Sequence, residues 1–167
     1  MALSANVKVS INATQTKTAD FESASSAIAL ALSVAFSDGT AAGQADRIFK
    51  DTRTLAASAT EDLDFSGSLA DIYGAAAVFA DIRVLCVMAD SANTNNVRVI
   101  RPASNGLPIF AAASDEIVVR PGGCFLYIAQ DTTAIPVTAG TGDLLTLTNS
   151  AGSTPVTYSI VAIGASA

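Results

Sequence analysis

The chain has 167 residues, a length that fits one domain able to bury a hydrophobic core of its own. Its formal net charge is −6 and its nine Lys and Arg residues are scattered along the sequence, so we expect no nucleic-acid binding. The chain contains no His, which removes the commonest general base and the commonest transition-metal ligand. No apolar run reaches the length of about 18 residues that a membrane-spanning helix needs, so we expect no membrane partner.

Charged residues make up only 14% of the chain, whereas 50% of its residues are apolar and Trp is absent. Globular domains usually carry about 25% charged residues. Because a surface with few charges resists self-association poorly, this composition suits a subunit of an assembly better than a free monomer. Residues 1–8 lack a charged segment followed by an apolar core, so we expect no signal peptide and synthesis in the cytoplasm.

Residues 5–13 alternate between apolar and polar side chains, which predicts a half-exposed strand. Val7, Val9 and Ile11 share the apolar face of this strand. Residues 14–26 are polar and weakly patterned, so their own burial cannot order them, and we predict a linker there.

We therefore divide the chain into an N-terminal strand or arm, residues 1–26, and a β-sandwich domain, residues 27–167. The strand at the start of the arm offers an apolar face and free backbone groups, which suits the addition of an edge to another sheet. The alternative, that this strand closes its own sandwich, stays open from the sequence.

The next two apolar segments also predict strands. In residues 27–36 large apolar side chains recur at every second position, and in residues 47–57 the Thr content favours a strand. The second segment carries charges of both signs, at Arg47, Asp51 and Arg53. These charges fit either a solvated strand edge with ion pairs that contribute about 0–1 kcal/mol each, or a polar contact between subunits.

Residues 61–66 place Leu63 and Phe65 on one face and acidic residues on the other, which predicts a further strand. We expect no calcium site there, because the glycine turn and the ligand spacing of a calcium-binding loop are absent. Residues 68–74 predict one short helical turn with Ser68 as its N-cap.

Residues 75–89 predict the long central strand of an antiparallel sandwich. The even positions, from Ala76 to Met88, are all apolar, whereas the odd positions include Asp81 and Arg83. This segregation is typical of a strand with one buried face, formed here by the even positions. The Ala-rich start of the segment leaves a short helix open as an alternative.

The second half of the chain predicts five more strands separated by turn-forming residues. They span residues 97–101, 116–120, 124–130, 143–148 and 156–163. The spacing of the candidate strands, roughly 8–12 residues, indicates a sandwich or barrel, and the absence of a longer repeat excludes a solenoid. We predict an all-β fold, an antiparallel β-sandwich of about eight to ten strands with at most one or two short helical turns.

Cys86 and Cys124 both lie within apolar runs. We predict two buried, reduced thiols, and a disulfide between the two sheets is the alternative. Neither the spacing nor the context of the two residues indicates metal binding or redox chemistry.

No catalytic pattern stands out in the sequence. A Ser–His or Cys–His dyad requires His, and the three lysines have no Ser-x-x-Lys context. The glycine-rich segments at residues 121–123 and 140–142 lie between predicted strands rather than before helices, so they predict turns rather than a phosphate loop. No signal selects a carboxylate pair for glycoside hydrolysis. We therefore predict a protein that is not an enzyme and that uses no cofactor and no metal ion.

Short segments after residue 43 carry a family resemblance. They are residues 44–48, 51–56, 62–64, 67–69, 93–97, 119–123, 138–144, 156–160 and 163–164. Through these segments the chain resembles a family of small tailed-phage virion proteins. The resemblance implies a jelly-roll-like sandwich that serves as a capsid decoration or cement subunit.

The resemblance also implies partners and a location. It implies contacts with the major capsid protein that stabilise a phage head, a homo-oligomer such as a dimer or trimer, and a place on the capsid surface of the virion after synthesis in the host cytoplasm. In that setting we expect residues 2–26 to dock on a neighbouring subunit, either another copy or the capsid protein. The predicted interaction residues are Val7, Val9, Ile11, Arg47, Asp51 and Arg53.

An adhesion module on a phage tail or fibre is the alternative function. Its loops, at residues 90–96 and 104–108, would then contact a glycan or protein on the host surface.

Overall fold

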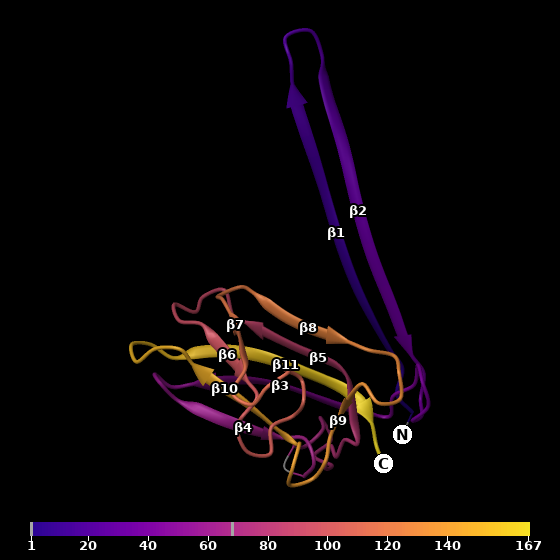
Figure 1. The fold of residues 1–167 in the computed structure, drawn as a ribbon, viewed down its shortest axis with the longest axis vertical. Helices are drawn as coiled ribbons and strands as arrows, with labels where there is room; N and C mark the ends of the chain where they lie inside the picture. Colours follow the sequence, from indigo (N-terminus) through magenta and orange to yellow (C-terminus); the bar gives the residue numbers. More distant parts are fainter. Residues whose placement is uncertain (1, 68) are drawn as a thin grey trace.

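The structure is a computed structural model that describes residues 2–67 and 69–167. Within these residues the chain forms eleven β-strands and no helix. The strands are β1 (Ala5–Thr18), β2 (Ser23–Phe36), β3 (Arg47–Leu55), β4 (Thr60–Asp64), β5 (Asp81–Ala89), β6 (Val97–Ile100), β7 (Glu116–Val119), β8 (Cys124–Ile128), β9 (Ile135–Pro136), β10 (Leu144–Asn149) and β11 (Val156–Ala165). β1 and β2 form a long arm, and the other nine strands form the body (Figure 1).

The body is a long hairpin of strands rolled into a sandwich. The innermost pair along the chain is β6 with β7. Successively outer pairs are β5 with β8, β4 with β10 and β3 with β11, and each pair is antiparallel. Two further ladders, β10 with β6 and β11 with β5, join these pairs into the sheets β4-β10-β6-β7 and β3-β11-β5-β8. The short β9 adds to β5. This nested pairing is that of a jelly roll, so the predicted all-β sandwich is confirmed.

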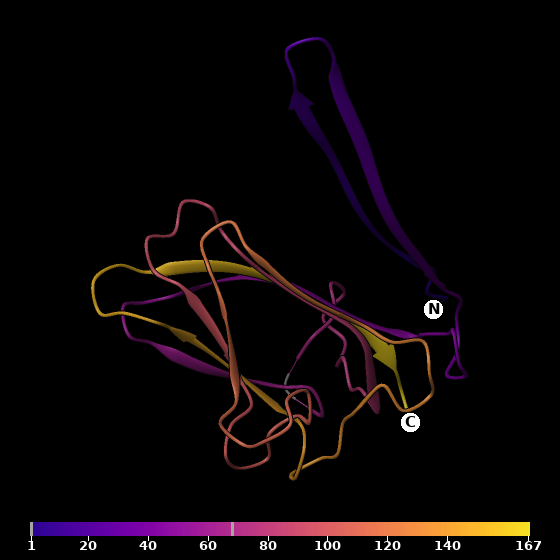
Figure 2. The same cartoon turned by 45° about the horizontal axis from the view of Figure 1, so that its top comes forward.

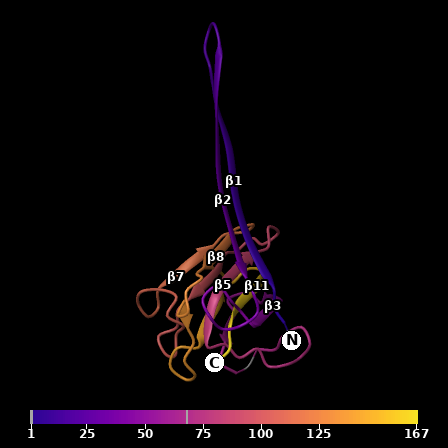
Figure 3. The ribbon, with the colours of Figure 1, turned by 90° about the vertical axis from the view of Figure 1, so that its right-hand side faces the viewer.

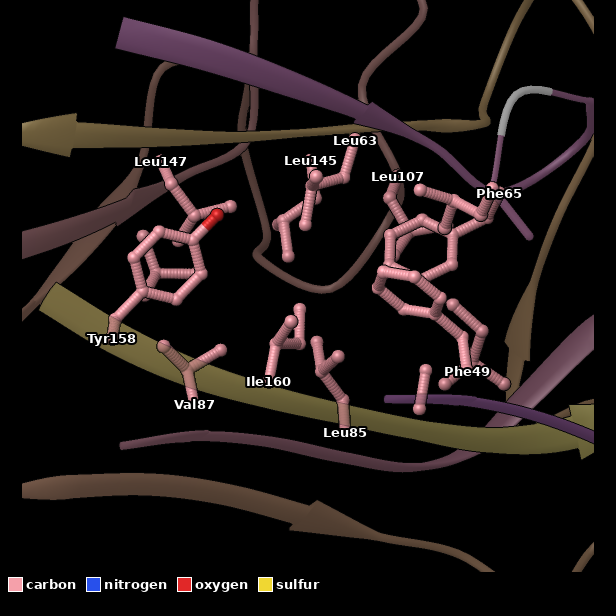
Figure 4. Packing of buried hydrophobic residues seen from close by; sticks show 14 of the residues in the cluster. Phe49, Leu63, Phe65, Leu85, Val87, Leu107, Leu145, Leu147, Tyr158 and Ile160 are labelled. Atoms are coloured by element: carbon pink, nitrogen blue, oxygen red, sulfur yellow. The ribbon is translucent and has the colours of Figure 1, made fainter. Parts of the chain in front are cut away.

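The hydrophobic core lies between the two sheets (Figure 4). Leu145 of β10 lies opposite Leu85 of β5 and Ile160 of β11, and all three side chains are fully buried. At one end of the core the rings of Phe65 and Phe79 meet edge to face, with centroids 5.8 Å apart. The inward-facing residues of both sheets therefore fill the space between the layers, as the alternation in the sequence requires.

β5 departs from regular alternation at Arg83. The ladder of β5 with β11 shifts register between Ile163 and Gly164, which makes Arg83 the extra residue of a β-bulge. The extra residue changes the parity of the inward-facing positions. Ile82 lies in the core before the bulge and Leu85 lies in the core after it.

The prediction of a one-sided strand over residues 75–89 is therefore wrong in two respects. β5 begins only at Asp81, because residues 75–80 form no ladder apart from an isolated bridge. After the bulge the buried face consists of odd positions such as Val87, whereas Met88 points outward and is 44% exposed. Parity arguments fail at a bulge because one extra residue exchanges the two faces of a strand.

The arm is an antiparallel hairpin whose strands pair along their whole length, from Ala5 opposite Phe36 to Thr18 opposite Ser23. It leaves the body at one end of the sandwich and points away from it in all three views (Figures 1, 2 and 3). The prediction of a linker over residues 14–26 is wrong, because cross-strand pairing turns most of this Thr-rich and Ser-rich segment into strand. The arm as observed extends to Phe36.

The helical turn predicted for residues 68–74 is not formed in the part of this segment that the structure describes. Ser68, the predicted N-cap, lies outside the described residues. The Asp71 side chain accepts hydrogen bonds from the backbone N–H groups of Tyr73 and Ala75, at 2.8 Å and 2.9 Å. A carboxylate that takes these donors stabilises a turn in place of a helix.

Gly164 lies opposite the bulge, where a Cβ atom would stand 1.9 Å from the backbone oxygen of Asp81. We expect Gly164→Ala to lower the free energy of unfolding by about 3 kcal/mol, because β11 and β5 must separate to admit the methyl group. Gly67→Ala is the matched control, since its Cβ would meet only the Oδ2 atom of Asp64, at 3.5 Å. Urea unfolding measures both variants, and equal stabilities would contradict the close approach of the two strands.

Candidate interaction site

The two faces of the arm differ in composition. The register fixes which residues share a face, since Val7 lies opposite Val34 and Ile11 opposite Leu30. One face, called here the arm's apolar face, consists of Ala5, Val7, Val9, Ile11, Ala13, Ile28, Leu30, Leu32, Val34 and Phe36. The other face carries small and polar side chains, among them Asn6, Lys8, Ser10, Asn12, Ala29, Ala31 and Ser33.

The arm's apolar face is buried near the body and exposed further out. Phe36 and Val34 are 1% and 6% exposed, whereas Leu32, Leu30 and Ile28 are 48%, 64% and 56% exposed. Nothing in a two-stranded ribbon covers these side chains, because the ribbon has no second layer. A run of large exposed apolar residues of this kind makes this part of the arm a candidate interaction surface.

The end of the arm nearest the body packs on the outer face of the β3-β11-β5-β8 sheet. The arm root is defined here as Ala5, Val7, Val34 and Phe36. It packs mainly against one row of side chains across the sheet, called the first row: Ile48 of β3, Ile163 of β11, Val84 of β5 and Ile128 of β8. Val161 of β11, two residues before Ile163, also packs against this cluster. The arm is therefore anchored by a small hydrophobic cluster on the side of this sheet that faces away from the main core.

Arg83 ties the segment between β2 and β3 to the body. Its side chain is fully buried, and its Nε atom donates a hydrogen bond to Oδ1 of Asp81 at 2.8 Å. Nη2 donates to the carbonyl oxygen of Thr40 at 2.6 Å, and Nη1 donates to the carbonyl oxygens of Ala41 and Gln44. The planar guanidinium thus holds three backbone carbonyls just after the arm, and the bulge on β5 aims it there.

The outer face of the same sheet is uncovered beyond the arm root. A second row across the sheet consists of Lys50, Val161, Cys86 and Leu126, and a third row consists of Thr52, Ser159, Met88 and Cys124. Met88 is 44% exposed and Leu126 is 36% exposed. Lys50 is the single charged residue of these two rows, so this surface is nearly neutral and largely apolar.

The structure places Arg47, Asp51 and Arg53 on β3 and gives each an ion-pair partner within the chain. Nη1 of Arg47 lies 3.1 Å from Oδ2 of Asp46, and Arg53 lies 2.8 Å from Asp51 and 2.7 Å from Glu61. Burial would lower the pKa of Arg53, but its hydrogen bonds with Glu61 and Asp51 outweigh burial and raise it. These pairs are local, and a contact of the three residues with another subunit stays a prediction.

A hollow of about 290 Å³ lies next to the arm root, between the start of β3 and residues 75–77. Its lining includes Asp46, whose carboxylate accepts hydrogen bonds from the hydroxyl and backbone N–H of Ser166, each at 2.7 Å. Burial would raise the pKa of Asp46, but these bonds and the nearby Arg47 outweigh it, so the pKa is lowered. Among residues 2–67 and 69–167 no three His, Cys, Asp or Glu side chains gather in a way that could hold a metal ion.

Comparison with protein-family models, with curated proteins and with solved structures finds no match to this chain. The resemblance to phage virion proteins therefore stays a prediction. The described part of the chain contains no helix with the length and apolar character needed to cross a membrane.

The structure brings Val7, Val9 and Ile11 to one face, as the sequence predicts. Val7 belongs to the arm root, Val9 is half-buried and Ile11 is 56% exposed. Sequence reasoning missed that residues 28–36 complete the same face. The available signal was two alternating segments flanking a Thr-rich and Ser-rich centre, which is the pattern of one long hairpin. Sequence reasoning also missed that Arg83 holds the segment after the arm, because in the sequence Arg83 is only a charged residue within an apolar strand.

The two cysteines lie on neighbouring strands of one sheet, so the alternative of a disulfide between sheets is wrong. Both are free thiols, and their Sγ atoms are 3.5 Å apart. The prediction of two buried thiols is also wrong for Cys124, which is exposed, because both side chains point to the outer face. Burial, and next the contact with Cys124, raise the pKa of Cys86 to about 12.

We expect Arg83→Ala to lower the free energy of unfolding by about 3–5 kcal/mol, because it leaves Asp81 without its buried partner and frees three carbonyls. Arg98→Ala is the matched control. Arg98 pairs with Glu116 on the surface, so its loss should cost about 0–1 kcal/mol. Urea unfolding measures both variants, and limited proteolysis reports whether residues 37–46 loosen. If Arg83→Ala lowers the free energy of unfolding no more than Arg98→Ala does, Arg83 does not hold the segment after the arm in the way proposed.

We expect Cys124 to react with a maleimide at pH 8 at least about ten times faster than Cys86, because thiolate is the reactive form and Cys86 holds its proton to high pH. Short labelling times followed by peptide mass mapping give both rates in the unmodified protein. The Cys86 rate should continue to climb as the pH is raised above 9. Equal rates at pH 8, measured at a protein concentration low enough to keep the chain monomeric, would contradict the greater burial of Cys86 relative to Cys124.

Proposed function

We propose that this protein is a structural virion subunit that decorates the outside of a phage head and stabilises it through protein–protein contacts. The observation that carries the proposal is the exposed part of the arm's apolar face, which includes Ile11, Ile28, Leu30 and Leu32. Completing the burial of each half-exposed side chain contributes on the order of 1 kcal/mol. An arm of this kind gains its stability from the surface that it covers, so it fits a protein that works inside an assembly.

The fold supports the proposal by analogy. The nine strands of the body, from β3 through β11, pair in the nested order of a jelly roll. Viral capsid domains share this architecture with lectin domains and cupins. Fold alone does not assign a function, so the analogy adds weight only beside the arm. The proposed partners are the major capsid protein and further copies of this chain, and the proposed location is the capsid surface. The proposal includes no catalytic step.

The adhesion alternative draws less support from the loop at residues 90–96. The Asn93 side chain donates to the carbonyl oxygen of Thr157 at 2.8 Å and accepts from the N–H of the same residue at 2.8 Å. The Asn95 side chain donates to Asn149 and to the carbonyl oxygen of Thr154. These amides hold β11 and the loop before it. Their hydrogen-bonding groups are therefore already used within the chain rather than offered to a host ligand.

A shortened arm tests the proposal. Residues 9–32 are replaced by Asn-Gly, which joins Lys8 to Ser33, two residues that face each other in the hairpin. Because the arm root remains, we expect the body to keep its stability, measured by urea unfolding. We expect the variant to lose binding to purified phage heads that lack the protein, measured by co-sedimentation.

Two point variants refine this test. Leu30→Lys should weaken binding to the heads at least about tenfold, since that factor corresponds to 1.4 kcal/mol. Ala29→Lys, on the opposite face of the same strand, should bind like the unmodified protein. Normal binding by the shortened arm would contradict the part of the arm in binding the head. Electron microscopy that finds the protein only at the tail tip would contradict the decoration role itself.

A further inference from the structure

The arm and the outer face of the β3-β11-β5-β8 sheet are two uncovered apolar surfaces of one chain. We propose that the exposed part of the arm's apolar face packs, in a second copy of this chain, on the second and third rows of that sheet. The inference deepens the proposed function, on which it rests, by naming the partner that the arm covers. It predicts an exchange of arms that closes a homo-oligomer.

The first support is that the same contact already exists within the chain. The arm root, on the same face of the same hairpin, packs on the first row of the same sheet. The exposed rungs Val9–Leu32, Ile11–Leu30 and Ala13–Ile28 continue the arm root outward, and the second and third rows continue the first row. Each surface therefore extends a contact whose complementarity the structure demonstrates.

The second support is that the arm cannot cover its own sheet. Beyond the root it points away from the body, as the views along two perpendicular directions show (Figures 1 and 3). Arg83 fixes the segment at the foot of the arm through the carbonyl oxygens of Thr40, Ala41 and Gln44. Apart from Val161, which packs against the arm-root cluster, the second and third rows thus stay open in the monomer, and an arm from another copy is free to reach them.

The third support is the match in charge and spacing. The three exposed rungs carry no charge, and the two open rows carry only Lys50, at the β3 edge, where its ammonium group can stay in water. Both surfaces repeat every two residues along a strand, a spacing of about 7 Å. Contact between them buries apolar side chains of Leu30 and Ile28 against Met88 and Leu126 and buries no charge.

Cross-linking between two different chains tests the contact. One chain carries Cys86→Ser, Cys124→Ser and Leu30→Cys, so its single thiol lies on the arm. The other carries only Cys86→Ser, so its single thiol is Cys124 on the third row. After the two are mixed and allowed to exchange subunits, a short bismaleimide should join position 30 of one chain to Cys124 of the other. Peptide mass mapping identifies the linked pair.

Ala29→Cys in place of Leu30→Cys is the matched control, because this side chain points to the opposite face of β2. We expect it to give at most a tenth of the cross-linked product. Two results overturn the inference. Links between the arms of two chains without a link to Cys124 mean that arms pair with arms, and a monomeric protein without any link means that the occupant is not a second copy.

Light scattering on the native protein checks the contact from the sheet side. We expect Met88→Lys and Leu30→Lys each to raise the dissociation constant of the oligomer at least tenfold. Val118→Lys, at a position with similar exposure on β7 of the other sheet, should leave it unchanged. Equal effects of Met88→Lys and Val118→Lys would contradict the assignment of the outer face.

The binding of phage heads separates this inference from the proposed function. If the cross-link is absent but the shortened arm fails to bind heads, the assembly role stands and the second copy is excluded as the partner. If the cross-link forms but the shortened arm binds heads normally, the arm exchange stands and the arm is not the part that binds the capsid.

Discussion

The buried guanidinium of Arg83 is the constraint on which the placement of the arm depends. It reaches three carbonyl oxygens of the segment that follows β2, and its charge is balanced by Asp81 on the same strand. A buried cation is tolerated only with its partners in place, so these backbone groups have few alternative positions. The bulge that aims Arg83 requires Gly164 on the opposite strand, where a side chain would collide with the backbone of Asp81.

The rolled topology explains why this one side chain can act on the arm. β5 lies between β11 and β8, in the interior of its sheet, and the arm precedes β3 at the sheet edge. An outward side chain from the middle of the sheet can therefore meet the segment that leads from the arm into β3. The arm root then covers the first row around Val84 and Ile163, so the polar contacts and the apolar cluster hold the same junction from two sides.

The sequence predicted the class of fold well because most strands of the body alternate with a period of two. It failed where a local device breaks that period, as at Arg83, whose bulge reversed the parity of Leu85 and Val87 relative to Ile82. It also failed where the order of a segment comes from backbone pairing rather than from burial. Residues 14–18 and 23–26 look unstructured because their burial is slight, yet each pairs across the hairpin. A strand whose order comes from cross-strand hydrogen bonds needs no alternation of its own, so a prediction based on burial overlooks it.

The arm's own energetics favour a partner. A two-stranded hairpin in water is at best marginally stable, and the outer half of this one has no layer beneath it. The arm root and the Arg83 contacts fix one end, but they do nothing for the rungs beyond Val9 and Leu32. Covering those rungs would couple the folding of the outer arm to association, since a partner that binds only the formed hairpin shifts its equilibrium by mass action. The order of the arm should therefore rise with protein concentration while the body, with a closed core of its own, stays folded throughout.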